Sequence, residues 1–249
     1  MYRCCVWMLI FLLLFVENAF GQAGPGPGVL ALRTMLQDRD PEIRVKAAEG
    51  LGRVGGRRSI MILRQGLGDK NTSVRIAVVQ ALGFIGGRLA MTVLSEALKD
   101  KSPEVRMRAV EALKEAGTVN SIPIIQKAFG DKEESVRRHA ALMLRMIGHR
   151  SAVPVLGKVA LDDKSPAVRA AAAAYLGKVG VKDIRAVGIL ANVLKDPNPT
   201  VRIRAVESLG FVQLPQAIPV LEKALEDRDP GVRIRATEVM GHVLAKNFE

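Results

Sequence analysis

Three histidines, two cysteines and a recurring aspartate–arginine spacing are the residues of this 249-residue chain that could do chemistry. Histidine can bind a metal or transfer protons, but His139, His149 and His242 lack the neighbouring glutamate or second histidine at helical spacing that such sites use. The sequence predicts no strand, and so it lacks the arrangement of a strand followed by a glycine-rich phosphate-binding loop. We therefore expect no catalytic residue, no metal site and no cofactor.

The aspartate–arginine spacing occurs seven times. An arginine follows six residues after each aspartate, giving Asp38 with Arg44, Asp69 with Arg75, Asp100 with Arg106, Asp131 with Arg137, Asp163 with Arg169, Asp196 with Arg202, and Asp227 with Arg233. A carboxylate and a guanidinium form strong, geometrically defined hydrogen bonds. Leaving one partner buried alone costs roughly 3–5 kcal/mol. We interpret these fourteen residues as structural rather than catalytic.

The elements that position these residues are helical. Successive arginines lie 31, 31, 31, 32, 33 and 31 residues apart, a period typical of a solenoid. Around each arginine, apolar residues recur at helical spacing, as in Val105, Ala109 and Leu113. A capping residue precedes this helix, and proline follows the cap in five copies. Shorter helices come before it, for example over 29–37, 122–129, 153–161 and 218–225.

Glycines mark two further positions in this pattern. One set is expected at the helix ends, and a second set lies inside the arginine-bearing helices at Gly52, Gly83, Gly177, Gly210 and Gly241. Each internal glycine costs about 1 kcal/mol of helix propensity relative to alanine. We expect it there because a neighbouring helix approaches closely.

The run Asp-x-x-Pro-x-Val-Arg-x-x-Ala-x-x-Ala-Leu-Gly, with its shorter partner helix, resembles the HEAT repeat of the armadillo-like superfamily. It is most similar to the short variety associated with phycobilisome lyase subunits. The resemblance implies an all-α, right-handed α-solenoid of about seven helix pairs over residues 29–249. It also implies that aspartate and arginine form a ladder between adjacent repeats. On physical grounds we expect each guanidinium that is fixed by a carboxylate to donate to loop carbonyls of the next unit as well. The His-Glu pairs of iron-binding HEAT hydroxylases are missing.

The N-terminal residues have a different character. Arg3 precedes an uncharged apolar run over 6–16 and small residues over 18–23, which predicts a secretory signal peptide over 1–23. Residues 24–28 are predicted to be a Gly/Pro linker. Cys4 and Cys5 would leave with the signal peptide. We expect export to the periplasm or the extracellular space, with an uncleaved membrane anchor as the alternative.

Net charge is +12, and the ladder contributes none of it. A basic residue directly follows six of the seven ladder aspartates, forming a predicted row along one edge: Arg39, Lys70, Lys101, Lys132, Lys164 and Arg228. These residues are either solvated turn cations or a docking edge for an acidic partner or an anionic surface.

Four repeats carry a Lys/Arg–Glu pair at i,i+3 on the arginine-bearing helix. Three repeats do not, and we take their residues as a candidate partner-binding surface or, alternatively, as core: Phe84, His139, Leu142, Met146, Ala171, Ala174 and Lys178. The predicted function is an exported, non-enzymatic scaffold that binds a protein partner through its concave face. The alternatives are an accessory enzyme subunit of the bilin-lyase type, or anion or nucleic-acid binding through basic edges. Export argues against nucleic acid as the physiological partner.

Overall fold

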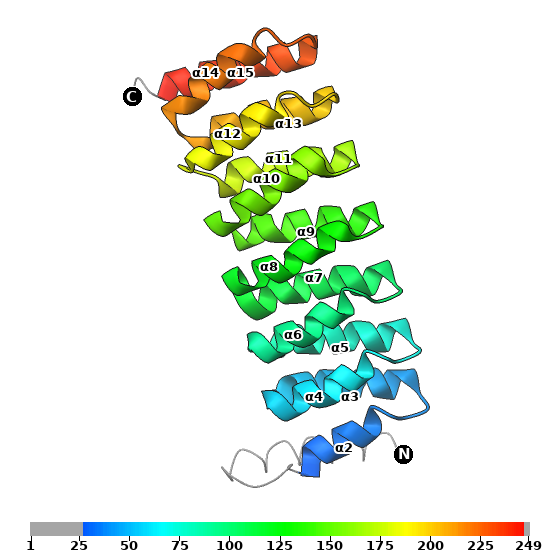
Figure 1. The fold of residues 1–249 in the computed structure, drawn as a ribbon. Coiled ribbons are helices and arrows are strands. Elements are labelled where there is room, and N and C mark those ends of the chain that lie inside the picture. Colours follow the sequence, from blue (N-terminus) through cyan, green and yellow to red (C-terminus); the bar gives the residue numbers. More distant parts are fainter. Residues whose placement is uncertain (1–26, 247–249) are drawn as a thin grey trace. The chain divides into compact units, whose positions relative to one another are not determined.

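The computed structural model describes residues 27–246, and this part of the chain is all-α, without a β-strand. Its helices form seven consecutive pairs (Figure 1). In each pair a shorter first helix precedes a longer second helix that carries the ladder arginine. This confirms the predicted all-α repeat solenoid. The predicted signal peptide and residues 24–26 of the predicted linker lie outside the described residues, whereas Pro27 and Gly28 of that linker belong to the first helix.

The chain divides into two compact units at Gly117. The first unit contains three helix pairs: α2 (Pro27–Met35) with α3 (Pro41–Val54), α4 (Gly56–Gly66) with α5 (Thr72–Ile85), and α6 (Gly87–Ala97) with α7 (Pro103–Gly117).

The second unit contains four pairs. Its first pair joins η2 (Thr118–Ser121), α8 (Ile122–Ile125) and η3 (Gln126–Gly130) to α9 (Glu134–Ile147). The expected helix over 122–129 is therefore divided, because its second half tightens into a 3₁₀ turn. The remaining pairs are η4 (Arg150–Ala152) and α10 (Val153–Asp162) with α11 (Pro166–Val179), α12 (Ile184–Val193) with α13 (Pro199–Val212), and η5 (Pro215–Ala217) and α14 (Ile218–Ala224) with α15 (Pro230–Lys246).

The second helices begin where the sequence predicts. The side chains of Asp40, Asn71 and Asn198 accept hydrogen bonds from backbone amides of the first helical turn. Ser165 departs from this pattern. Its hydroxyl donates to a carboxylate oxygen of Glu134 in the preceding repeat, at 2.8 Å, and so joins two repeats instead of capping one helix.

A leucine lies seven residues after the ladder arginine in six of the seven second helices. This residue is at most 1 % exposed in Leu51, Leu82, Leu113, Leu144, Leu176 and Leu209, whereas α15 has the half-buried Met240 at this position. Burying such a side chain stabilises the fold by about 1.5–3 kcal/mol. This repeated leucine is one of several buried positions in each repeat, and first helices contribute others such as Leu63, Leu156 and Leu190.

The internal glycines allow second helices to pack closely. A Cβ atom on Gly52 would lie 2.9 Å from the Cβ of Ala81, and one on Gly83 would lie 2.8 Å from the Cβ of Ala112. At Gly177 it would lie 2.6 Å from the backbone of Ser208. These contacts confirm the predicted close approach. Gly241 is the exception, because no described helix follows α15 and its Cβ would meet nothing within 4 Å.

The ladder joins neighbouring repeats within each unit. The Nε atom of an arginine donates to an aspartate oxygen of the next repeat at 2.6–2.8 Å, and Nη2 donates to the other oxygen at 2.8–3.1 Å. The five pairs are Arg44–Asp69, Arg75–Asp100, Arg137–Asp163, Arg169–Asp196 and Arg202–Asp227. A repeat between two others of its unit thus supplies its guanidinium to the following repeat and its carboxylate to the preceding one.

The carbonyl contacts of the ladder differ from the expectation. Each guanidinium donates through Nη1 to the carbonyl of the aspartate six residues earlier in its own repeat, at 2.8–2.9 Å, and not to a loop of the next repeat. The reason is that the arginine lies on the first turn of the second helix and folds back over the turn that precedes it. Within one repeat, the arginine therefore binds the backbone carbonyl of the aspartate six residues earlier. The side chains of these two residues form their salt bridges with different neighbouring repeats.

Three ladder carboxyls, Asp69, Asp196 and Asp227, are held in their charged form. Burial alone would raise the pKa of Asp69, Asp196 and Asp227, but hydrogen bonds from the arginine and from the backbone amide two residues on outweigh it and lower the pKa. A carboxylate fixed by these donors is a structural anion and does not serve as a general base. The geometry agrees with the structural interpretation of these residues.

Candidate protein-binding face

The second helices present one exposed position in every repeat, nine residues after the ladder arginine. It is occupied by Arg53, Phe84 and Glu115 in the first unit, and by Met146, Lys178, Phe211 and His242 in the second. Helical geometry explains the exposure, because this position lies two residues after the buried core leucine and so points away from it. We call this set the outer row.

Apolar members of the outer row are unusually exposed. Phe84 on α5 is 73 % exposed, Met146 on α9 is 55 % exposed, and Phe211 on α13 is 44 % exposed. Single exposed apolar residues are common on soluble proteins. Met146 and Phe211 of the second unit are therefore candidates for a contact surface, and Phe84 is a separate candidate in the first unit.

In the second unit, cations and aromatic rings alternate across three neighbouring helices. The guanidinium of Arg145 on α9 lies 5.5 Å from the ring centroid of Tyr175 on α11. The Nζ atom of Lys178, one turn further along α11, lies 3.3 Å from the ring centroid of Phe211 on α13. We call these four residues the cation–aromatic stripe. Contacts of this kind are worth about 0.5–1 kcal/mol at exposed sites and hold the cation in place without neutralising it.

The two helices that carry the cations of this stripe, α9 and α11, contain almost no negative charge. α11 contains no acidic residue, and α9 contains only Glu134, which is bonded to Ser165. On α13 and α15, in contrast, Arg204 and Arg235 are paired with Glu207 and Glu238 at 2.7–3.2 Å. Apart from the ladder arginines, Arg204 and Arg235 of α13 and α15 are therefore paired with glutamate, whereas Arg145 of α9 and Lys178 of α11 are not.

The candidate partner-binding residues lie on or beside the outer row. Phe84, Met146 and Lys178 are exposed, and His139, Leu142, Ala171 and Ala174 are partly exposed. None of the seven is fully buried, but His139, Leu142, Ala171 and Ala174 are largely covered, so both the partner-binding and the core interpretation of these residues stay predictions. Phe84 belongs to the first unit, and the other six lie on α9 and α11, beside the stripe.

Three stripe residues were missed by sequence reasoning. Phe211 was missed because repeats were sorted by the presence of an i,i+3 charge pair, and Phe211 lies in a repeat that has one. Arg145 and Tyr175 lie in selected repeats, but they were not among the residues chosen there. The available signal was the position nine residues after the arginine, where Phe211 aligns with Phe84, Met146 and Lys178.

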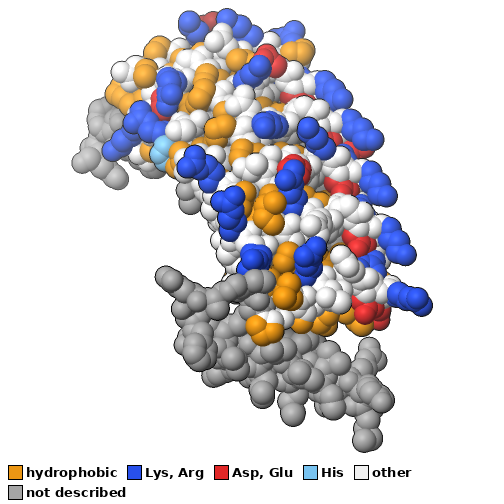
Figure 2. All heavy atoms as spheres, turned by 60° about the horizontal axis from the view of Figure 1, so that its bottom comes forward, with side chains coloured by type: hydrophobic (Ala, Val, Ile, Leu, Met, Phe, Trp, Pro, Cys, Tyr) orange, Lys and Arg blue, Asp and Glu red, His pale blue; other side chains and the backbone are white. Residues whose placement is uncertain are grey.

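The candidate docking edge lies at the turns between first and second helices. Its six basic residues are all exposed: Arg39, Lys70, Lys101, Lys132, Lys164 and Arg228. Acidic side chains accompany them, and Figure 2 shows lysine and arginine beside aspartate and glutamate along one edge of the repeats. Lys70 and Arg228 contribute to the lowered pKa of Asp69 and Asp227, so part of their field acts on the ladder. Docking through this edge stays a prediction.

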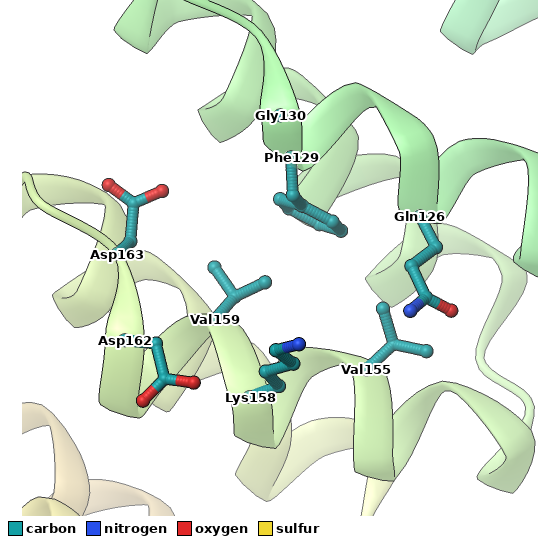
Figure 3. Close-up of a pocket in the computed structure, with 8 residues that line it drawn as sticks. All are labelled: Gln126, Phe129, Gly130, Val155, Lys158, Val159, Asp162 and Asp163. Atoms are coloured by element: carbon teal, nitrogen blue, oxygen red, sulfur yellow. The ribbon is translucent and has the colours of Figure 1, made fainter.

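A cavity of about 280 Å³ lies among first helices of the second unit, between η3 and α10. Figure 3 shows the ring of Phe129 facing the gap between Val155 and Val159, with the carboxylate of Asp162 turned outward. The other carboxylate, Asp163, is already bound by Arg137. Within residues 27–246 no group of three or more His, Cys, Asp or Glu side chains is placed to hold a metal ion. No helix in that range combines the length and apolar character needed to cross a membrane.

A family model for HEAT repeats matches residues 29–114, 91–177 and 153–241. The chain belongs to the HEAT-repeat family. None of the curated proteins compared with it matches significantly.

Solved structures agree on the fold. The karyopherin Kap121p, bound to the extreme C-terminus of the protein phosphatase Cdc14p, is 15 % identical with a TM-score of 0.63; the match covers 89 % of this chain and 30 % of the karyopherin. The CpcE–CpcF complex of phycocyanin lyase from Nostoc sp. PCC7120 is 20 % identical with a TM-score of 0.47, over 90 % of this chain and 98 % of that chain. Human deoxyhypusine hydroxylase is 21 % identical with a TM-score of 0.46, over 87 % and 96 %. At 15 % identity, the similarity to the karyopherin concerns the solenoid fold.

Proposed function

We propose that this HEAT-repeat protein is an exported scaffold that binds a protein partner through the face formed by its second helices. The cation–aromatic stripe is the observation that carries the proposal. Aromatic residues and arginine are enriched where protein interfaces draw most of their binding energy. The stripe offers two rings and two cations on neighbouring helices, with Met146 and partly exposed Leu142 beside it.

The chemistry of the stripe favours a partner segment that combines acidic and apolar side chains. Arg145 and Lys178 have no carboxylate partner among the described residues, so a bound carboxylate would gain two preplaced cations. Apolar side chains of the partner would pack against the small side chains of Ala171 and Ala174, next to Met146. Export is proposed from the sequence of residues 1–23 and is tested separately.

The first experiment replaces Leu142 and Met146 together by glutamate in the full-length chain. The wild-type protein and the variant would each be used for affinity capture from an envelope extract, and the captured proteins would be identified by mass spectrometry. We expect the variant to keep its helical content and to lose the partner that the wild type retains. A sharp fall in melting temperature would instead place these two residues in the core.

A second variant tests the charge in the stripe. Arg145→Gln with Lys178→Gln removes both cations, and Lys46→Gln with Arg108→Gln removes two cations that are paired with Glu49 and Glu111. Loss of the partner with the first variant alone supports the proposal, and equal binding by both variants contradicts it. If activity appears only with a co-purified subunit, the protein is an accessory subunit of an enzyme.

Export has its own measurement. Mass spectrometry of the protein recovered from its native cell envelope reads the mature N-terminus, which the proposal places after Gly21 or Ala23. Recovery of the intact N-terminus in the cytoplasmic fraction would refute export and leave the binding face unaffected.

A further inference from the structure

A second exposed patch lies in the second unit, at turns that join one repeat to the next. It consists of Val181, Lys182, Ile184 and Arg185, from the turn between α11 and α12 and the start of α12, together with Arg150 of η4. We call these five residues the turn patch. None of them belongs to the ladder or to the cation–aromatic stripe.

The backbone of the turn patch is held by both neighbouring repeats. The amide of Lys182, a non-glycine residue at φ 56°, donates to the carbonyl of Val212 at 2.8 Å. The guanidinium of Arg185 donates to the carbonyl of Arg150 at 3.3 Å. Because the turn is fixed on both sides, its outward side chains keep their positions.

Those outward side chains are apolar and cationic in alternation. Val181 is 44 % exposed and Ile184 is 55 % exposed. Lys182, Arg185 and Arg150 are exposed beside them. Aliphatic side chains that protrude from a turn and are flanked by cations fit the boundary between a charged surface and an apolar layer.

The cations surround a cavity of about 350 Å³ that Ile184 and Leu214 also line. One carboxylate, Asp183, faces it and is already bound by Arg185 through contacts of 2.6–3.2 Å. The hydrogen bond from Arg185 is the main cause of the lowered pKa of Asp183, and Arg150 adds to it. Three cations and one carboxylate leave the cavity with two net positive charges, enough to attract a phosphate group.

This combination separates the turn patch from the candidate docking edge. At that edge, Lys132 is followed by Glu133 and Glu134, and Lys164 follows Asp162 and Asp163. At the turn patch, the single carboxylate is buried and occupied, and aliphatic side chains are exposed instead. The turn patch therefore combines uncompensated charge with an apolar contact surface.

We propose that the turn patch docks the protein on a bilayer surface rich in anionic phospholipid. The guanidinium and ammonium groups would bind headgroup phosphates, and Val181 and Ile184 would enter the boundary with the acyl chains. Nucleic acid fits less well, because valine and isoleucine offer no ring on which a base could stack. The proposal does not depend on the protein-binding face, whose residues lie outside the patch.

The experiment measures binding of the full-length chain to sedimenting vesicles. Vesicles of phosphatidylcholine alone would be compared with vesicles containing phosphatidylglycerol. One variant, Arg150→Gln with Lys182→Asn, removes two cations, and asparagine tolerates the positive φ at position 182. The matched control, Lys132→Gln with Lys164→Gln, removes two cations from the other edge of the same unit. A third variant, Val181→Ser with Ile184→Ser, removes the apolar contacts and keeps every charge.

We expect the first variant to lose roughly fivefold in phosphatidylglycerol-dependent affinity for each cation removed, and the control to bind like the wild type. The serine variant should also weaken binding, while all variants melt like the wild type. Residues 1–23 are the same in every protein, so any binding through them cancels in the comparison.

Three results would overturn the proposal. In the first, the cation variant binds phosphatidylglycerol vesicles as tightly as the wild type, and in the second, the wild type does not distinguish the two lipids. In the third, binding is also measured to polyglutamate and duplex DNA, and the cation variant loses only that binding, which would assign the patch to an acidic polypeptide or a nucleic acid.

Discussion

Replacing Arg202 by leucine tests the ladder where it joins the last two repeats. The substitution removes two hydrogen bonds to the carboxylate of Asp227, both at 2.8 Å, and two to carbonyls of its own turn, at 2.8 and 3.1 Å. The side chain of Asp227 is only 12 % exposed, so its charge would be left mostly buried without its guanidinium partner. Removing one partner of such a pair costs about 3–5 kcal/mol.

The assay is urea unfolding followed by circular dichroism, with thermal melting as a second measurement. We expect the free energy of unfolding to fall by about 3–5 kcal/mol, which corresponds to about 2–4 °C of melting temperature for each kcal/mol. Because a solenoid is stabilised by nearest-neighbour interfaces, the last repeat should also begin to unfold before the rest.

Two comparisons identify the cause of this loss. Arg202→Leu combined with Asp227→Leu should destabilise less than the sum of the single changes, because no buried charge then lacks a partner. Lys46→Ala breaks an exposed i,i+3 pair with Glu49 and should cost about 0.2–0.5 kcal/mol. If Arg202→Leu costs no more than Lys46→Ala, the ladder does not hold the repeats together, and the reasoning is wrong.

Three further predictions concern acid stability, packing and surface exposure. Four carboxyls have a lower pKa in the folded chain than in the unfolded one: Asp69, Asp183, Asp196 and Asp227. The stabilisation of the folded chain by these ionised carboxyls is complete above about pH 4 and is lost as the pH falls below it. The urea concentration at the unfolding midpoint should therefore decline from about pH 6 to about pH 3, and less steeply in Asp196→Asn. A midpoint that does not change with pH would contradict this. Gly177→Ala should destabilise by about 1–3 kcal/mol because its Cβ would clash with Ser208, whereas Gly188→Ala on α12, with nothing within 4 Å, should stabilise by up to about 1 kcal/mol. Equal effects at the two glycines would refute the close helix approach. Phe84→Ser should change stability by less than about 0.5 kcal/mol, whereas Leu82→Ala, two residues earlier and fully buried, should cost about 2–5 kcal/mol in the same unfolding assay; a large loss at Phe84 would show that its ring is packed.

The architecture could be predicted because one spacing repeats through nearly the whole chain. The period of the arginines defines the repeat, and the apolar positions between them define the buried side of each helix. Gly52 and Gly83 indicated close helix packing before any coordinates, because glycine inside a helix has a cost that only close contact explains. These signals are local to one repeat, and the sequence shows them directly.

The direction of the ladder could not be predicted in the same way. Asp196 and Arg202 lie six residues apart, which suggests that they form a pair, yet the carboxylate that Arg202 binds belongs to Asp227. Similarly, Phe211 lies in a repeat that carries a charge pair, and its contact with Lys178 depends on how α11 and α13 lie side by side. Contacts between repeats depend on stacking, and the sequence of one repeat does not contain that information.

The direction of the ladder also affects how such an array can change in length. Every ladder contact described within a unit uses an arginine, an aspartate and two backbone carbonyls at equivalent repeat positions. One such contact can therefore substitute for another. If the repeat that contains Asp163 and Arg169 were deleted, Arg137 would meet Asp196 with the hydrogen bonds it now makes to Asp163. Gain or loss of a whole repeat therefore preserves the ladder contacts, whereas repeat-specific contacts such as the hydrogen bond from Ser208 to the carbonyl of Ala173 would be lost.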